Sequence, residues 1–281
     1  MQLKVFKTLW GYRGSLEEAL DECTADGFDG LEGPSPDTRE ERHALRRELD
    51  ERGLDFIAEI CTAGSYVPRR EATIAEHLDS FERKIEGAIE CGALFITSLA
   101  GCDAWSLENN VAFFQKAHQM AKQAGIVASF EIHRSRSLFN PWVTRDVLCR
   151  LPELRLTCDY SHWCVVCERL IDSEPDVLAL CASRAHHIHA RVGYEHGPQV
   201  PDPAAHEYSY ALHAHERWWR QIWAEQRLSG REIVTMTAEF GPDGYMQTLP
   251  HTQMPVADLG AVNRWMAKRQ KEQFNSWIHQ V

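Results

Sequence analysis

A repeated unit of helix, glycine and short apolar strand is the feature that most constrains how this chain can fold. The unit occurs four times in the first half, and its helices end at Gly27, Gly53, Gly92 and Gly125. Glycine just after a helix readily takes the left-handed conformation that ends it. The residues that follow are apolar and strand-forming, so we expect strands at 28–32, 54–60, 93–99 and 126–132.

Helices fit between these strands. Ser15 and Glu18 form the pattern of a capping box, which predicts the start of the first helix. Ser106 is placed to cap another helix that runs to Gln123. The helix between them has apolar residues at spacings of three and four, which predict one buried stripe: Ile74, Leu78, Phe81, Ile85 and Ile89.

The second half continues the alternation less regularly. We expect strands at 3–10, 155–159, 186–192 and 232–239, and a last helix over about 256–278. Alternating strands and helices imply a parallel sheet with right-handed crossovers, and eight such units close into a barrel. The alternative, an open doubly wound sheet, would carry a glycine-rich phosphate loop after its first strand, and the segment at 10–14 does not match one. The sequence therefore predicts a single (β/α)8 TIM barrel domain over 1–281.

One connection is longer than the others, at about 193–210, after the predicted seventh strand. Its prolines and glycines argue against regular structure. Such a loop in a compact domain is usually a lid or a binding loop, and the alternative is a segment that only packs against the barrel.

Composition excludes some classes of function. The net charge of −11 disfavours nucleic acid and anionic membrane surfaces as partners. The first residues lack the apolar core of a signal peptide, so we expect a cytoplasmic protein whose nine cysteines are reduced. Cys164 and Cys167 form a lone C-x-x-C pair, a weak signal for zinc or redox chemistry. A homo-oligomer remains open, because the aromatic segment at 217–223 suits either barrel packing or a subunit contact.

Acidic or histidine residues end most of the predicted strands: Glu32, Glu59, Glu131, Asp159, His189 and Glu239. In a parallel barrel these strand ends meet at one mouth, where active sites lie. Carboxylates gathered there repel one another unless a cation or proton compensates them. The sequence therefore predicts a metal site.

Four of these residues, Glu131, Asp159, His189 and Glu239, form an oxygen-rich ligand set without cysteine. Such a set suits one divalent ion, with Mn²⁺ or Mg²⁺ favoured and Co²⁺ or Zn²⁺ tolerated. His187 lies on the same strand face as His189 and is the alternative imidazole ligand.

At this point the chain resembles the xylose isomerase-like barrel superfamily, which includes sugar phosphate isomerases and epimerases. The similarity rests on short segments in the superfamily's order around Glu131, Asp159, His189 and Glu239, and on an early Asp29-Gly-Leu-Glu32. It implies that these four residues bind one metal, and that Glu131 and Glu239 move a proton beside a carbonyl through an enediolate. Further residues are then expected to contact the carbohydrate substrate: His162, Arg191, His133, Glu32 and Trp10.

The resemblance implies a metal-dependent sugar isomerase or epimerase that acts on a keto sugar or polyol. A lyase remains open, either a dehydratase or an enzyme that cleaves 3-keto glycosides, because the superfamily's aspartate after His189 is replaced by Val192. An apurinic endonuclease would need more metal ligands and a basic groove. A non-catalytic sugar-binding barrel is the remaining alternative. His133 is also compatible with a neutral core imidazole, and Trp10 with a packing role.

Overall fold

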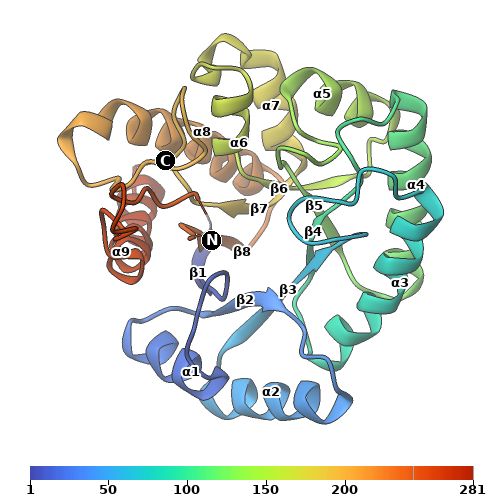
Figure 1. The fold of residues 1–281 in the computed structure, drawn as a ribbon, viewed down its shortest axis with the longest axis horizontal. Helices are drawn as coiled ribbons and strands as arrows, with labels where there is room; N and C mark the ends of the chain where they lie inside the picture. Colours follow the sequence, from blue (N-terminus) through green and yellow to red (C-terminus); the bar gives the residue numbers. More distant parts are fainter. Residues whose placement is uncertain (243, 281) are drawn as a thin grey trace.

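The computed structural model describes residues 1–242 and 244–280, and these residues form a closed barrel of parallel strands (Figure 1). The strands pair in chain order, and the last pairs with the first: β1 Gln2–Thr8, β2 Gly30–Pro34, β3 Asp55–Cys61, β4 Ile96–Leu99, β5 Ala128–Glu131, β6 Arg155–Cys158, β7 Ala185–His189 and β8 Ile233–Ala238. The predicted (β/α)8 barrel is confirmed, and all eight strands overlap the expected ranges.

Helices surround the strands (Figure 1). They are α1 Leu16–Ala25, α2 Arg39–Arg52, α3 Ile74–Glu90, α4 Leu107–Gln123, α5 Pro141–Arg150, α6 Ser161–Val166, α7 Pro175–Arg184, α8 Ser209–Leu228 and α9 Leu259–Ile278, with short 3₁₀ turns η1 Ile171–Ser173 and η2 His206–Tyr208. None of the helices in the described ranges is both long and apolar enough to cross a membrane.

Local sequence signals explain where the helices begin and end. The capping box of Ser15 and Glu18 is present at α1, and Gly53 ends α2 with a φ of 65°. Two predictions about helix ends differ from the structure. The last helix begins at Leu259, because Asp258 rather than an earlier residue caps it. Ile89 ends the predicted stripe of α3 but is 41% exposed, because it lies in the last turn, beyond the barrel surface that the rest of the stripe covers.

The barrel interior is layered, and the layers place the site at one end. Phe6, Ile57 and Phe95 form a small apolar cluster inside the barrel. Above it lies a layer of hydroxyl groups, in which Thr157 Oγ1 is 2.7 Å from Thr97 Oγ1 and 2.8 Å from Ser129 Oγ. Because side chains alternate along a strand, the next inward positions hold the polar residues predicted at the strand ends.

Candidate metal centre

The four residues predicted as metal ligands lie together at the carboxyl ends of four consecutive strands. Glu131 ends β5, Asp159 follows β6, His189 ends β7 and Glu239 follows β8. One potential ligand atom of each lies within 4.8 Å of those of the other three. All four side chains are buried. We call this set the tetrad.

The tetrad fits a divalent ion. His189 Nδ1 is 2.9 Å from Glu239 Oε2 and 3.5 Å from Glu131 Oε1, yet Nδ1 and Glu239 Oε2 have no hydrogen-bond partner in the described ranges. Glu131 Oε2 is also buried without one. Metal–ligand bonds of about 2.1 Å place neighbouring ligands about 3.0–3.4 Å apart. A cation site requires buried ligand atoms at this spacing that make no hydrogen bonds to one another.

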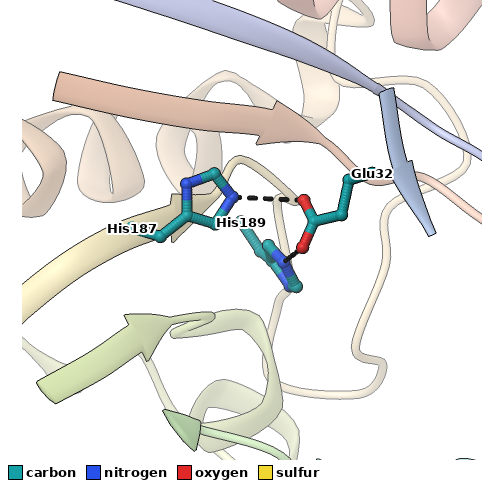
Figure 2. A group of neighbouring side chains, drawn as sticks. All are labelled: Glu32, His187 and His189. Atoms are coloured by element: carbon teal, nitrogen blue, oxygen red, sulfur yellow. Dashed lines mark hydrogen bonds and ion pairs between the residues drawn. The ribbon is translucent and has the colours of Figure 1, made fainter. Parts of the chain in front are cut away.

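Glu32 orients the histidine of the tetrad. Its carboxylate lies between two imidazoles of β7, at 3.0 Å from His189 Nε2 and 3.2 Å from His187 Nε2 (Figure 2). Thr237 Oγ1 donates a further hydrogen bond to Glu32. A proton on His189 Nε2 directed at Glu32 leaves Nδ1 free to face the tetrad, the arrangement in which an outer carboxylate fixes a metal-binding imidazole.

This placement differs from the substrate contact expected of Glu32. Both carboxylate oxygens are engaged by protein groups, and the side chain is 2% exposed. His187 is likewise turned toward Glu32 and toward Thr235 Oγ1, 2.8 Å from its Nδ1, so it lies outside the tetrad. The geometry favours His189 as the ligand and Glu32 as its positioning residue.

The three carboxylates of the tetrad concentrate negative charge in a buried place. Burial raises the pKa of Glu131, and Glu239 and Asp159 raise it further. Burial would lower the pKa of His189, but the carboxylates of Glu239, Glu32 and Glu131 raise it well above its usual value. Both shifts favour the protonated form, and a divalent ion bound by the tetrad would displace these protons.

Arg191 supplies a fixed cation beside the tetrad. Its Nη2 contacts Asp159 Oδ2 and lies 2.6 Å from His162 Nε2, and its Nε donates to Ser161 Oγ at 3.1 Å. The guanidinium is also 3.5 Å from Glu239 Oε2. Arg191 lines the site, but most of its donors are engaged by Asp159, Ser161 and His162, so it holds these side chains in place.

The rings of His162 and His133 lie against each other beside the tetrad, with centroids 4.0 Å apart and planes tilted by 49°. Together with Glu131 they form a second group of potential ligand atoms within 4.8 Å. His162 is fully buried and accepts a hydrogen bond from Arg191, whereas His133 lines the open part of the site. Burial lowers the pKa of both imidazoles well below the usual value, so both are neutral at pH 7.

A narrow hollow opens above the tetrad. The residues that line it are Trp10, Glu59, Tyr66, Leu99, Glu131, His133, Arg191, Glu239 and Tyr245. Trp10, predicted as a substrate contact, packs edge-on against Tyr66 and Tyr245 at centroid distances of 5.5 and 4.8 Å. The ring needs Gly241, because a Cβ there would lie 1.9 Å from the indole. Neither tyrosine could be predicted from the sequence, because both lie in loops without periodicity.

Arg136 fixes the rim of the hollow and was also missed. Its side chain is 0% exposed, and all its hydrogen bonds in the described ranges go to the loops after β3 and β4. They include Thr62 O at 2.7 Å, Tyr66 O at 2.9 Å and Gly101 O at 3.3 Å, and the side chain also contacts Ser65 O. Arg136 therefore ties the loop that carries Tyr66 to the loop after β5.

The long loop after β7 packs beside the hollow instead of covering it. Gln199 exchanges two hydrogen bonds with the backbone of Gly241, at 2.9 and 3.2 Å, and Val200 is fully buried. None of the described residues at 193–208 lines the hollow. These contacts match the packing alternative for this loop.

The nine cysteines lie outside the clusters of potential metal ligands found in the described part of the chain. All nine cysteines are free, and Cys164 is buried with its Sγ 4.0 Å from His215 Nε2. Within the described ranges, no cluster of three or more potential metal ligands includes a cysteine. The Cys164–Cys167 pair therefore gives no support to a zinc or redox site.

Solved structures of other proteins have a fold similar to that of this chain. A zinc-bound IolI protein aligns with a TM-score of 0.62 and 14% identity over 98% of this chain and 96% of its own. D-psicose 3-epimerase from Clostridium cellulolyticum H10 aligns at 0.61 and 13%, over 97% of both chains. The 3-keto-D-glucoside 4-epimerase of E. coli aligns at 0.60 and 13%, over 95% and 98%.

At such identities these structures establish the fold alone, and no curated protein matches the sequence significantly. The family described as the xylose isomerase-like TIM barrel matches residues 20–202, well over half of the chain. With the closed barrel already in place, this match assigns the protein: the chain belongs to the xylose isomerase-like TIM barrel family.

Proposed function

We propose that the protein is a divalent-metal-dependent isomerase or epimerase that acts on a keto sugar or a polyol-like carbohydrate. The observation that carries the proposal is the tetrad, in which two of the carboxylates, Glu131 and Glu239, also line the hollow above it. Structures of similar fold include two sugar epimerases and a zinc-bound protein, which supports both parts of the proposal.

Glu131 and Glu239 would move the proton. They extend from β5 and β8, strands well separated around the barrel, so they approach a bound molecule from different sides. One carboxylate would remove the proton from the carbon beside the carbonyl, and the other would return a proton to the opposite face. A positioned carboxylate is a competent base once the C–H bond is acidified.

The remaining residues would hold the reactants in place. The ion, Mn²⁺ being our first choice, would when bound polarise the carbonyl and offset the charge of the enediolate. Trp10 and Tyr245 line the hollow, and their rings would contact the apolar side of a sugar. Arg191 and His133, which line the hollow, would hold substrate oxygens. The fully buried His162 would support Arg191, which also holds the carboxylate of Asp159. Free cysteines fit a reducing compartment, and we propose the cytoplasm.

Proton abstraction can be tested without knowledge of the natural substrate. The protein is incubated in D₂O with Mn²⁺ and a panel of keto sugars, and NMR reports deuterium uptake beside the carbonyl and any new epimer or aldose. A chelator should abolish both signals. Glu131→Gln should reduce exchange at least 100-fold and keep the native circular dichroism. Full exchange in this variant would overturn the assignment of Glu131 as the base.

A further inference from the structure

Glu59 is the carboxyl group of the hollow that the tetrad does not use. It lies near the end of β3, where its neighbours along the inward face are Ile57 of the interior cluster and Cys61. It lines the same hollow as Glu131 and Glu239. A molecule bound over the tetrad would therefore have three carboxyl groups around it.

The protein leaves Glu59 almost without partners. Its one hydrogen bond in the described ranges comes from Cys61 Sγ at 3.5 Å, and a thiol is a weak donor. No lysine, arginine or histidine of those ranges lies within ion-pair distance of it, whereas the other acidic residues of the site each have one: Glu32, Glu131, Asp159 and Glu239.

Glu59 is half-buried in the wall of the hollow, and a carboxylate partly withdrawn from water is costly to ionise when no cation pairs with it. Burial, together with the negative charges of Glu239 and Glu32, raises the pKa of Glu59 to about 7. A purely structural role does not explain this arrangement, because an apolar residue could pack at position 59 without the cost of ionising a carboxylate. The position instead suits a proton donor that faces a bound molecule.

We propose that Glu59 donates a proton to a substrate oxygen two carbons from the carbonyl, so that the site can eliminate water or an alcohol. This inference rests on the proposed function, because the same proton abstraction comes first. It gives the site a second outcome, which requires a substrate with a hydroxyl or glycosidic oxygen β to its carbonyl.

The step balances without any further reactant. A tetrad carboxylate takes the proton from the carbon beside the carbonyl, and the electron pair forms the new C=C bond. The C–O bond at the β-carbon breaks, and its electron pair leaves with the oxygen. That oxygen takes the proton of Glu59 and departs as water or an alcohol. The tetrad carboxylate then releases its proton to solvent, and Glu59 takes up one from solvent, so both groups return to their starting states.

The test compares Glu59→Gln with the wild-type protein in D₂O, with Mn²⁺ and keto sugars that carry a β-hydroxyl or β-glycosidic oxygen. Glutamine keeps the size of the side chain but cannot deliver a proton of useful acidity. NMR measures exchange beside the carbonyl, and ultraviolet absorbance measures the conjugated elimination product. Glu86→Gln, at an exposed position on α3, is the matched control. Mn²⁺ affinity, measured by calorimetry, should be the same in all three proteins.

We expect Glu59→Gln to retain exchange within about threefold and to lose elimination by about 100-fold, with partial recovery in Glu59→Asp. Elimination at the wild-type rate in Glu59→Gln would overturn the role of Glu59. So would a wild-type protein that exchanges deuterium but never eliminates, and both results leave the proposed function intact. A wild-type protein that shows no exchange would overturn the proposed function and this inference with it.

Discussion

Replacing Glu32 by glutamine should weaken binding of a divalent ion at the tetrad by about 10- to 100-fold, the usual effect of removing an outer carboxylate from a metal-bound histidine. In free energy this is about 1.4–2.7 kcal/mol. The structure gives the reason. Glu32 faces His189 Nε2 at 3.0 Å and His187 Nε2 at 3.2 Å, so both carboxylate oxygens act as acceptors.

Glutamine keeps the volume but turns one of these acceptors into an NH₂ donor. At least one imidazole then loses its acceptor, and a hydrogen bond to a charged group contributes about 1.5–3 kcal/mol. If the histidine affected is His189, its ring is free to turn or to change tautomer, and Nδ1 is no longer directed at the other ligands. The expected loss of affinity is therefore of the same size as one charged hydrogen bond.

Isothermal titration calorimetry with Mn²⁺, and with Zn²⁺ as a tighter-binding probe, measures this loss. Circular dichroism checks that the variant is folded, and Glu86→Gln provides an exposed control whose affinity should not change. A Glu32→Gln protein that is folded and binds both ions within twofold of wild type would refute the view that Glu32 orients His189.

Three further results follow from the structure. The carboxylates raise the pKa of His189, so this residue is protonated at pH 7 before metal is added. Mn²⁺ binding should therefore release at least one proton. Calorimetry in buffers of different ionisation enthalpy measures this release, and zero release would contradict the prediction. Gly241→Ala should destabilise the fold by about 1–3 kcal/mol in urea unfolding, since its Cβ would meet Trp10; unchanged stability would count against that contact. Arg136→Met should cost about 3 kcal/mol, because buried carbonyls lose their donor, and an unaltered unfolding midpoint would disprove this.

The ionisation of Glu32 determines how the stability of the protein changes as the pH falls. Burial would raise its pKa, but His189 and His187 hold it well below the usual value of a glutamate. A lowered pKa contributes stability above about pH 4.5, the value expected in the unfolded chain, and that contribution is lost as the pH falls through the folded-state pKa. The metal-free wild type should therefore lose stability below about pH 4.5 more steeply than Glu32→Gln, as measured by urea unfolding across pH 3–6.

The barrel and the position of the tetrad could be predicted because both follow from local periodicity. Glycines after helices mark the returns to β2, β3, β4 and β5, and parallel strand ends meet at one mouth whatever their sequence separation. Glu131 and Glu239 could thus be placed together although more than 100 residues lie between them.

The orientation of individual side chains could not be predicted in this way. The contact of Glu32 with His189 depends on the distance across the barrel from β2 to β7, which no spacing along the chain encodes. Tyr66 and Tyr245 lie in irregular loops, where alternation gives no information. Arg136 was missed for a different reason, since arginine is almost never fully buried without a partner, and here the partners are backbone carbonyls.

Because Arg136 binds backbone carbonyls, the side chains of the rim can be substituted during evolution without loss of its contacts. Arg136 recognises the loops after β3 and β4 through their main chain alone in the described ranges, apart from a 3.4 Å contact with the Thr62 hydroxyl. Every amino acid offers the same carbonyl, so side chains at positions such as Ser65 and Tyr66 can be exchanged without releasing the loop. The rim can therefore acquire new ligand preferences by substitution while its shape is inherited unchanged.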